Sequence, residues 1–104
     1  MSKQRSAFEG FARKASEELG DSLNKLVLYG SLARGDENAS SDVDVFAVVN
    51  DKEDLEVLRD LAFEIGLIQH GVHISVQGVI KESFEQRKDH PFINTVLTEG
   101  EVYV

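Results

Sequence analysis

The stretch that decides the fold is VLYGSLARGDENASSDVDVFAVV, residues 27–49. It begins inside an apolar run, residues 25–29, that stops at Gly30 and is typical of a buried strand. Residues 30–41 are polar, contain two glycines and predict a turn, a short helix and a loop. Residues 42–50 are rich in Val and Phe and predict a second strand. Two apolar strands separated by a polar segment therefore form the expected centre of the fold.

Two long helices are expected, one before and one after this centre. The first covers residues 3–19, is followed by Gly20, and has one apolar stripe: Phe8, Phe11, Ala12, Ala15 and Leu19. The second begins after a cap at Asn50 or Asp51, ends at Gly66, and has one apolar face: Leu55, Leu58, Leu61, Ala62 and Ile65.

The rest of the chain adds a strand, two short helices and an edge strand. Residues 71–80 alternate in polarity, with Val72, Ile74 and Val76 on one face and His73, Ser75 and Gln77 on the other. Residues 81–88 predict a short helix. Pro91 opens another helix, which ends near Gly100 and is expected to bury Phe92, Ile93, Val96 and Leu97. Residues 101–104 predict an edge strand. Without a repeat or linker, residues 1–104 are expected to form one α/β (α+β) domain.

The chemistry of the chain is concentrated in its central stretch. Ten residues separate Gly30-Ser31 from the Asp42-Val43-Asp44 triplet that opens the second strand. Residues two apart in a strand point to one face, about 6.6 Å apart, so Asp42 and Asp44 form a carboxylate pair. Such a pair, together with substrate phosphates, suits Mg²⁺. Gly30 allows close approach of an anion, and Ser31 offers a hydroxyl and an N–H to phosphate oxygens.

Each of these pieces also has a purely structural interpretation. Gly-Ser after a strand forms plain turns, and Asp at a strand entrance caps or turns the chain. Arg34 suits either a phosphate clamp or an ion pair with Asp36 or Glu37. His70 and His73, three apart, would lie on opposite faces of a strand and are not expected to share a metal.

Other motifs are excluded by missing parts. The chain has no Gly-Lys-Ser/Thr tripeptide of a P-loop and no Gly-x-Ser-x-Gly of a serine hydrolase. A calcium loop starting at Asp42 would need Asp or Asn at position 46 and Gly at position 47, where Phe46 and Ala47 stand.

Composition narrows the class of protein further. The formal net charge of -8 argues against broad nucleic-acid binding. The chain has no cysteine, which favours a reducing compartment. No apolar run approaches the ~20 residues of a membrane span, and the polar start lacks a signal-peptide core. A cytoplasmic protein without membrane contact is expected.

The run of residues 27–49 resembles the signature of minimal nucleotidyltransferase (MNT) domains of the DNA polymerase beta superfamily: Gly-Ser, ten residues, Asp-x-Asp. The closing segment PFINTVLTEGEVYV also looks like the end of such domains. The resemblance implies a palm-like mixed sheet of three to four strands flanked by helices. It also implies that Gly30, Ser31 and Arg34 bind the nucleotide, and that Asp42 and Asp44 are catalytic and bind Mg²⁺ or Mn²⁺. ATP would be the substrate.

The same resemblance suggests a partner and raises an alternative. Many such domains are antitoxins of HEPN-type toxins, and some transfer AMP to a tyrosine of the toxin. Active members typically carry a third acidic residue on a later strand, where this chain offers His73, Ser75 and Gln77; Asp36 and Glu37 in the loop are other places to look. The chain is therefore expected to be either an AMP-transferring antitoxin or a module of the same fold that neutralises its partner by occlusion.

Overall fold

A four-stranded mixed sheet lies in the middle of the structure, a computed structural model that describes residues 2–36, 38 and 40–104. The spatial order is β3-β2-β1-β4, with the bounds β1 Leu23–Tyr29, β2 Val43–Val49, β3 Ile74–Ile80 and β4 Glu101–Val102. β1 runs antiparallel to β2 and to β4, whereas β2 and β3 are parallel. The predicted fold class and the mixed sheet are confirmed.

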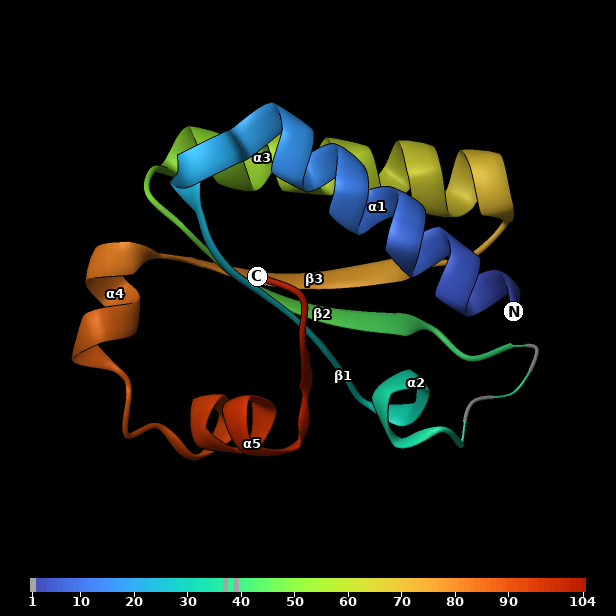
Figure 1. Ribbon diagram of the computed structural model, residues 1–104. Helices are drawn as coiled ribbons and strands as arrows, with labels where there is room; N and C mark the ends of the chain where they lie inside the picture. The colour runs from blue at the N-terminus through green and yellow to red at the C-terminus, as the bar shows by residue number, and fades with distance from the viewer. Residues whose placement is uncertain (1, 37, 39) are drawn as a thin grey trace.

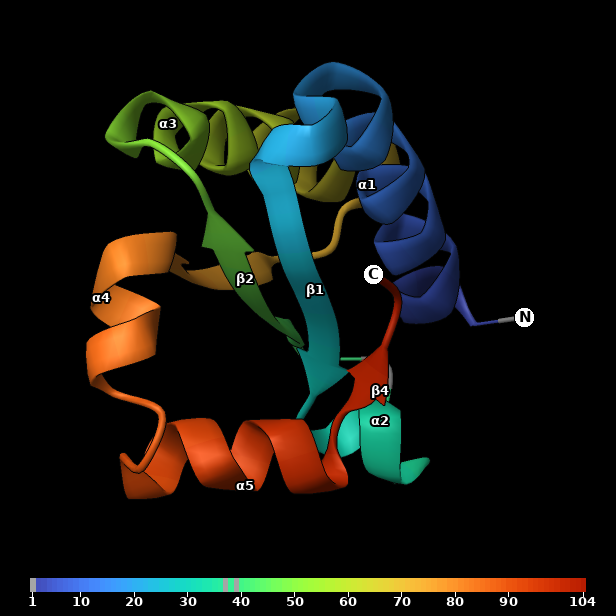
Figure 2. The ribbon, with the colours of Figure 1, turned by 60° about the vertical axis from the view of Figure 1, so that its left-hand side comes forward.

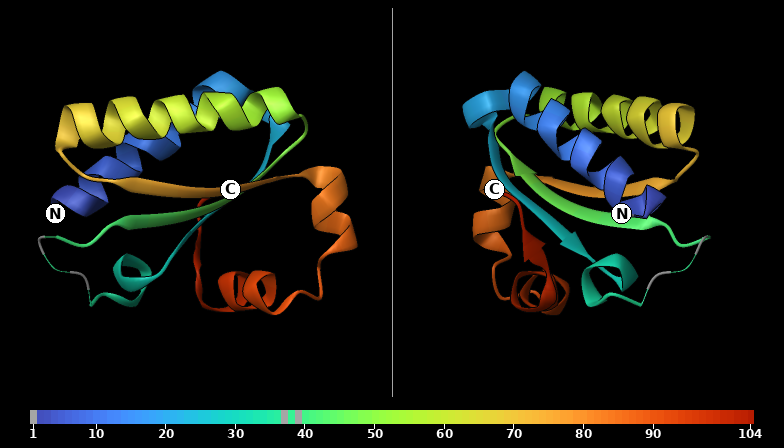
Figure 3. Two further views of the ribbon diagram at one scale, coloured as in Figure 1. Left: turned by 180° about the vertical axis from the view of Figure 1, so that it is seen from behind. Right: turned by 45° about the vertical axis from the view of Figure 1, so that its right-hand side comes forward.

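Two long helical segments cover one face of this sheet (Figure 1). They are α1 (Lys3–Leu19) and α3 (Lys52–Leu61), which is continued by the π-helical segment η2 (Ala62–His70). Seen from behind and from the side, both still lie on the same side of the strands (Figure 3). The larger buried apolar cluster fills this layer and joins Phe8 and Phe11 of α1, Leu58 of α3 and alternate residues of the strands. Among the described residues, no helix is long and apolar enough to cross a membrane.

The second long helix continues past Gly66, where the sequence predicts its end, and stops at His70. A Cβ atom on Gly66 would lie 2.7 Å from the carbonyl oxygen of Val72 and 2.9 Å from the Ile74 side chain. This glycine therefore permits close packing, and Gly71, with a φ of +66°, ends the helix instead. His70 consequently lies on a helix and not on a strand, and its Nδ1 is 2.8 Å from the carbonyl oxygen of Ile65.

Two shorter helices, α4 (Lys81–Gln86) and α5 (Pro91–Glu99), cover the other face of the sheet (Figure 2). A second, smaller cluster is buried there: Val27, Phe46, Val48, Phe84, Ile93 and Val96. The prediction that Phe92 and Leu97 are buried is wrong, because they remain 41% and 36% exposed. Ile93 and Val96 of this short helix are buried against the strands, whereas Phe92 contacts Tyr29 and Phe46 and stays partly open.

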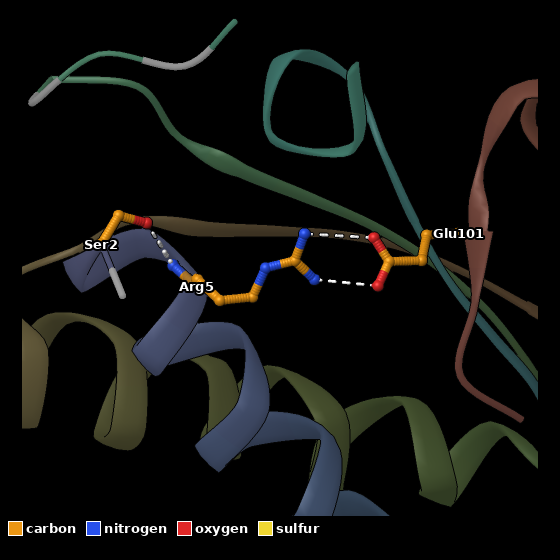
Figure 4. Close-up of polar contacts among 3 residues, drawn as sticks. All are labelled: Ser2, Arg5 and Glu101. Atoms are coloured by element: carbon orange, nitrogen blue, oxygen red, sulfur yellow. Dashed lines mark hydrogen bonds and ion pairs between the residues drawn. The ribbon is translucent and has the colours of Figure 1, made fainter. Parts of the chain in front are cut away.

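The two ends of the chain are bound to each other (Figure 4). The hydroxyl of Ser2 accepts a hydrogen bond from the backbone N–H of Arg5 at 3.0 Å and so caps α1. The Arg5 guanidinium donates two hydrogen bonds, of 2.9 and 3.1 Å, to the carboxylate of Glu101 in β4. β4 is shorter than the predicted strand at residues 101–104, although the N–H of Tyr103 still donates to the Leu26 carbonyl at 2.8 Å.

Candidate active site

The glycine of the central motif lies directly against its second aspartate. Gly30 follows β1 and precedes the short helix α2 (Ser31–Arg34), with a φ of +78° and a ψ of -156°. This backbone conformation is essentially restricted to glycine. A Cβ atom at this position would clash with Oδ2 of Asp44 and lie 3.2 Å from its Cγ. The structure therefore brings the turn and the carboxylate together, as the motif predicts.

Asp44 lies between two polar neighbours on the sheet face that α4 and α5 partly cover. Its register partners are Tyr29 in β1 and Ser75 in β3, and partners on adjacent strands share a face. Burial raises the pKa of the Asp44 carboxyl, as does the negative charge of Asp42, while His73 and Arg34 act in the opposite direction. The ionised form of a partly buried carboxyl beside another acid is stabilised by a bound cation.

Tyr29 shares this environment. Its hydroxyl has a raised pKa, first because it is partly buried and second because Asp44 is nearby. The phenol therefore stays protonated near neutral pH and can donate a hydrogen bond on the same sheet face as the carboxylate.

Asp42 stands one residue before β2 and is more open than Asp44. Its Oδ2 lies 3.4 Å from Nδ1 of His73, and both side chains are more than half exposed. The backbone supports this position, because the N–H of Val43 donates to the carbonyl of His73 at 2.9 Å. The two aspartates therefore differ: Asp44 is held between strands, and Asp42 lies at the rim with a histidine beside it.

Arg34 ends α2 and pairs with a residue of the loop. Its Nε donates to Oδ2 of Asp36 at 3.3 Å, and both side chains are more than half exposed. An exposed pair of this kind contributes only ~0–1 kcal/mol, so Arg34 can exchange Asp36 for a phosphate at little cost. Glu37, the other predicted partner of Arg34, lies outside the described residues.

A third carboxylate is not found beside the aspartate pair in the described part of the chain. The position next to Asp44 on β3 is Ser75, and the next residue on that face, Gln77, pairs with Phe46. Within the described residues, no group of three or more His, Cys, Asp or Glu side chains is placed to hold a metal ion. Asp36 is paired with Arg34. The arrangement thus offers two carboxylates for one divalent ion, with the remaining ligands left to phosphates and water.

A neighbouring cavity was missed by the sequence reasoning. It has a volume of about 280 Å³, lies between α2, α5 and the end of β1, and includes Gly30, Phe92 and Glu99 in its lining. Figure 2 shows α2 and α5 at the same side of the molecule. No pattern near Gly30 in the sequence indicates this cavity, because α5 comes from a distant part of the chain.

Residues 10–103 match the nucleotidyltransferase domain family, and the chain belongs to that family. This confirms the resemblance to nucleotidyltransferases of the DNA polymerase beta superfamily, and the mixed sheet flanked by helices agrees with their fold.

Two relatives come from Methanocaldococcus jannaschii. One, named "Putative protein adenylyltransferase MJ0604", is 31% identical over 96 residues, which cover 92% of this chain and 93% of the relative. The second, MJ1305, carries the same description and is 31% identical over 93 residues, or 85% of this chain. This chain spans 63% of the second relative's length.

A solved structure shares the fold at lower sequence identity. The crystal structure of a toxin-antitoxin complex with AMP-PNP superposes with a TM-score of 0.57 and 20% sequence identity. The match covers 90% of this chain and 70% of that one.

Proposed function

We propose that the protein transfers AMP from ATP to a hydroxyl group of a partner protein, with Mg²⁺ or Mn²⁺ as cofactor, and that it acts as the antitoxin of a HEPN-type toxin. The observation that carries the proposal is the contact between the Gly30 backbone and the Asp44 carboxylate, with Asp42 two residues before it. Support comes from the adenylyltransferase description of the two relatives and from the toxin-antitoxin complex that shares the fold.

The donor set fits a divalent ion that arrives with a polyphosphate. Asp42 and Asp44 supply carboxylate oxygens as ligands. The charge of Asp42 raises the pKa of Asp44, and a cation bound between the two carboxylates would favour the ionised form of Asp44. Mg²⁺ is typically held by one or two carboxylates, substrate phosphates and waters. When bound, the ion would neutralise phosphate charge and activate the attacking hydroxyl.

The remaining side chains bind and orient the triphosphate. Ser31, which opens α2 directly after Gly30, would offer its hydroxyl and backbone N–H to the phosphates, and Arg34 would supply a bidentate donor. In the reaction, the acceptor oxygen bonds to the α-phosphorus, the bond from that phosphorus to the bridging oxygen breaks, and pyrophosphate leaves. The hydroxyl proton passes to solvent or to a base of the partner. Alignment of the hydroxyl by the bound partner would offset much of the barrier.

A specific observation favours a second function. Ser75, and not an acid, lies beside Asp44, whereas the resemblance to active nucleotidyltransferases implies a third acidic residue on a later strand, so activation of the hydroxyl would be weakened. In this alternative, the domain binds the nucleotide and its partner and neutralises the partner by covering its active site.

Transfer and occlusion can be separated in one experiment. The protein is incubated with ATP labelled at the α-phosphate, Mg²⁺ or Mn²⁺, and the product of the neighbouring gene, and the partner is analysed by intact mass. The proposal predicts a gain of one AMP on the partner, lost in Asp44→Asn. A stable complex that inhibits the partner without any mass gain supports occlusion and contradicts transfer.

A further inference from the structure

We propose that the cavity between α2 and α5 receives the nucleoside of the triphosphate and that Phe92 is the surface on which its base stacks. The inference rests on the proposed function and extends it to a site for the base. It starts from a spatial relation: Gly30, which faces Asp44, also lines this cavity. A nucleotide with its phosphates at the Gly30 turn therefore has the cavity within reach.

The cavity has the size and composition of a small ligand site. Its volume of about 280 Å³ lies just below the ~300–1,000 Å³ typical of such sites and is large enough for a single base. Tyr29 and Phe92 supply aromatic lining, and Thr95 adds a hydroxyl. A mostly apolar cleft with a few polar groups suits the flat base of a nucleoside better than its phosphates.

Phe92 is held in place while part of its ring remains open. Its ring meets Tyr29 edge to face, with 5.6 Å between centroids and an interplanar angle of 84°. A second contact, to Phe46, has 6.3 Å between centroids and an angle of 72°. Despite both contacts, Phe92 is 41% exposed. An aromatic ring that is held by contacts on its sheet side and is still accessible can stack on a base with little loss of side-chain entropy.

The charges on the cavity wall set the direction in which a nucleotide binds. Arg34, which ends α2, and Glu99, the last residue of α5, both line the cavity. A carboxylate repels phosphates and only accepts hydrogen bonds, so Glu99 favours the N–H or O–H donors of a nucleoside. The phosphates therefore lie toward the Asp pair and Arg34, and the nucleoside lies toward Phe92, near the start of α5.

Titration calorimetry on the full chain tests the contribution of Phe92. Mg·ATP and Mg·tripolyphosphate are compared, since the second has phosphates but no nucleoside. The variant Phe92→Ala loses one base stack. It should therefore bind Mg·ATP about tenfold more weakly than the wild type and bind Mg·tripolyphosphate with unchanged affinity. Phe92→Leu, which keeps an apolar side chain, should show the same loss, whereas Phe92→Tyr should restore binding. Leu97→Ala, on the same helix and outside the cavity lining, serves as the matched control.

A second readout does not depend on affinity. The chain contains no tryptophan, so Phe92→Trp introduces a single indole. Stacking on a base should quench its fluorescence when Mg·ATP is added, and Mg·tripolyphosphate should leave the emission unchanged. Leu97→Trp should respond to neither ligand.

The outcomes separate this inference from the function on which it rests. Mg·ATP binding that is equally strong in Phe92→Ala and in the wild type overturns the nucleoside site and leaves the proposed function intact. Failure of the wild type to bind either Mg·ATP or Mg·tripolyphosphate overturns both. Circular dichroism of each variant identifies any loss of folding, and in that case the tryptophan fluorescence decides.

Discussion

A methyl group added at Gly30 is expected to damage both the stability of the fold and the carboxylate site. The φ of +78° with ψ of -156° costs a residue with a Cβ atom about 1–3 kcal/mol. The new Cβ would also clash with the Asp44 carboxylate, so that side chain must leave its position. For a domain of this size, 1 kcal/mol corresponds to about 4–8 °C in Tm. Gly30→Ala should therefore lower the Tm by about 4–24 °C and abolish detectable Mg·ATP binding.

Gly35→Ala is the matched control for this substitution. Gly35 has the same φ of +78°, but among the described residues, its chain neighbours aside, no atom lies within 4 Å of its expected Cβ. Its Ala variant should lose stability, by about 1–2 kcal/mol, and still bind Mg·ATP. Thermal unfolding followed by circular dichroism gives the stability, and calorimetry gives the affinity.

A double-mutant cycle isolates the contact itself. In an Asp44→Ala background, which shortens the clashing side chain, Gly30→Ala should cost less than in the wild type. An equal cost in both backgrounds, or unchanged Mg·ATP binding by Gly30→Ala, would refute the reasoning that the turn and Asp44 form one unit.

Three further substitutions test separate parts of the account. Asp44→Asn should stabilise the metal-free protein at pH 7, because burial and Asp42 raise the pKa of Asp44 and its charge opposes folding above that pKa. Urea unfolding should show this gain shrinking as the pH falls toward the ordinary value of 3.8. Ser75→Asp, beside Asp44, should increase AMP transfer to the partner by up to about 10²-fold, measured with labelled ATP; an unchanged rate means that the third acid comes from elsewhere. Gly66→Ala should destabilise the fold by about 1–3 kcal/mol in urea unfolding, despite the higher helix propensity of alanine, because its Cβ meets the Val72 carbonyl.

The order of the strands and helices could be predicted because the hydrophobic periodicity and the residues that end helices and strands agree along most of the sequence. Lys3–Leu19 has a single apolar stripe between a serine cap and a glycine, and the helix has those bounds. The alternation of residues 72–77 likewise placed Ser75 and Gln77 on one face of β3, and His73 stands directly before this strand. These features depend on local spacing alone.

The errors have a common physical origin in contacts between distant residues. Gly66 looks like a helix end, but it is a glycine because β3 passes close to the helix there. Phe92 looks like a core residue of α5, but the helix turns only Ile93 and Val96 fully toward the sheet. Neither outcome is encoded within a few residues of the position concerned.

In the candidate site, too, features set by local spacing could be predicted and features set by contacts between distant residues could not. The spacing between Gly30 and Asp44 pointed to a shared site, and the structure places the two in contact. The sequence left open which residue of β3 lies beside Asp44, and the register identifies Ser75. The cavity at Phe92 depends on how α5 packs beside the Gly30 turn, and α2, α3, η2 and α4 separate the two in the chain, so no local pattern could reveal it.

The central claim is that Asp42 and Asp44 hold a divalent ion together with ATP, and calorimetry with and without Mg²⁺ tests it most directly. A chain of formal charge -8 with two carboxylates at its site should repel a bare triphosphate, so ATP should bind with Mg²⁺ and fail to bind in EDTA. The double variant Asp42→Asn and Asp44→Asn should remain folded and lose this dependence on the metal. Equal ATP affinity of the wild type in Mg²⁺ and in EDTA would contradict the account.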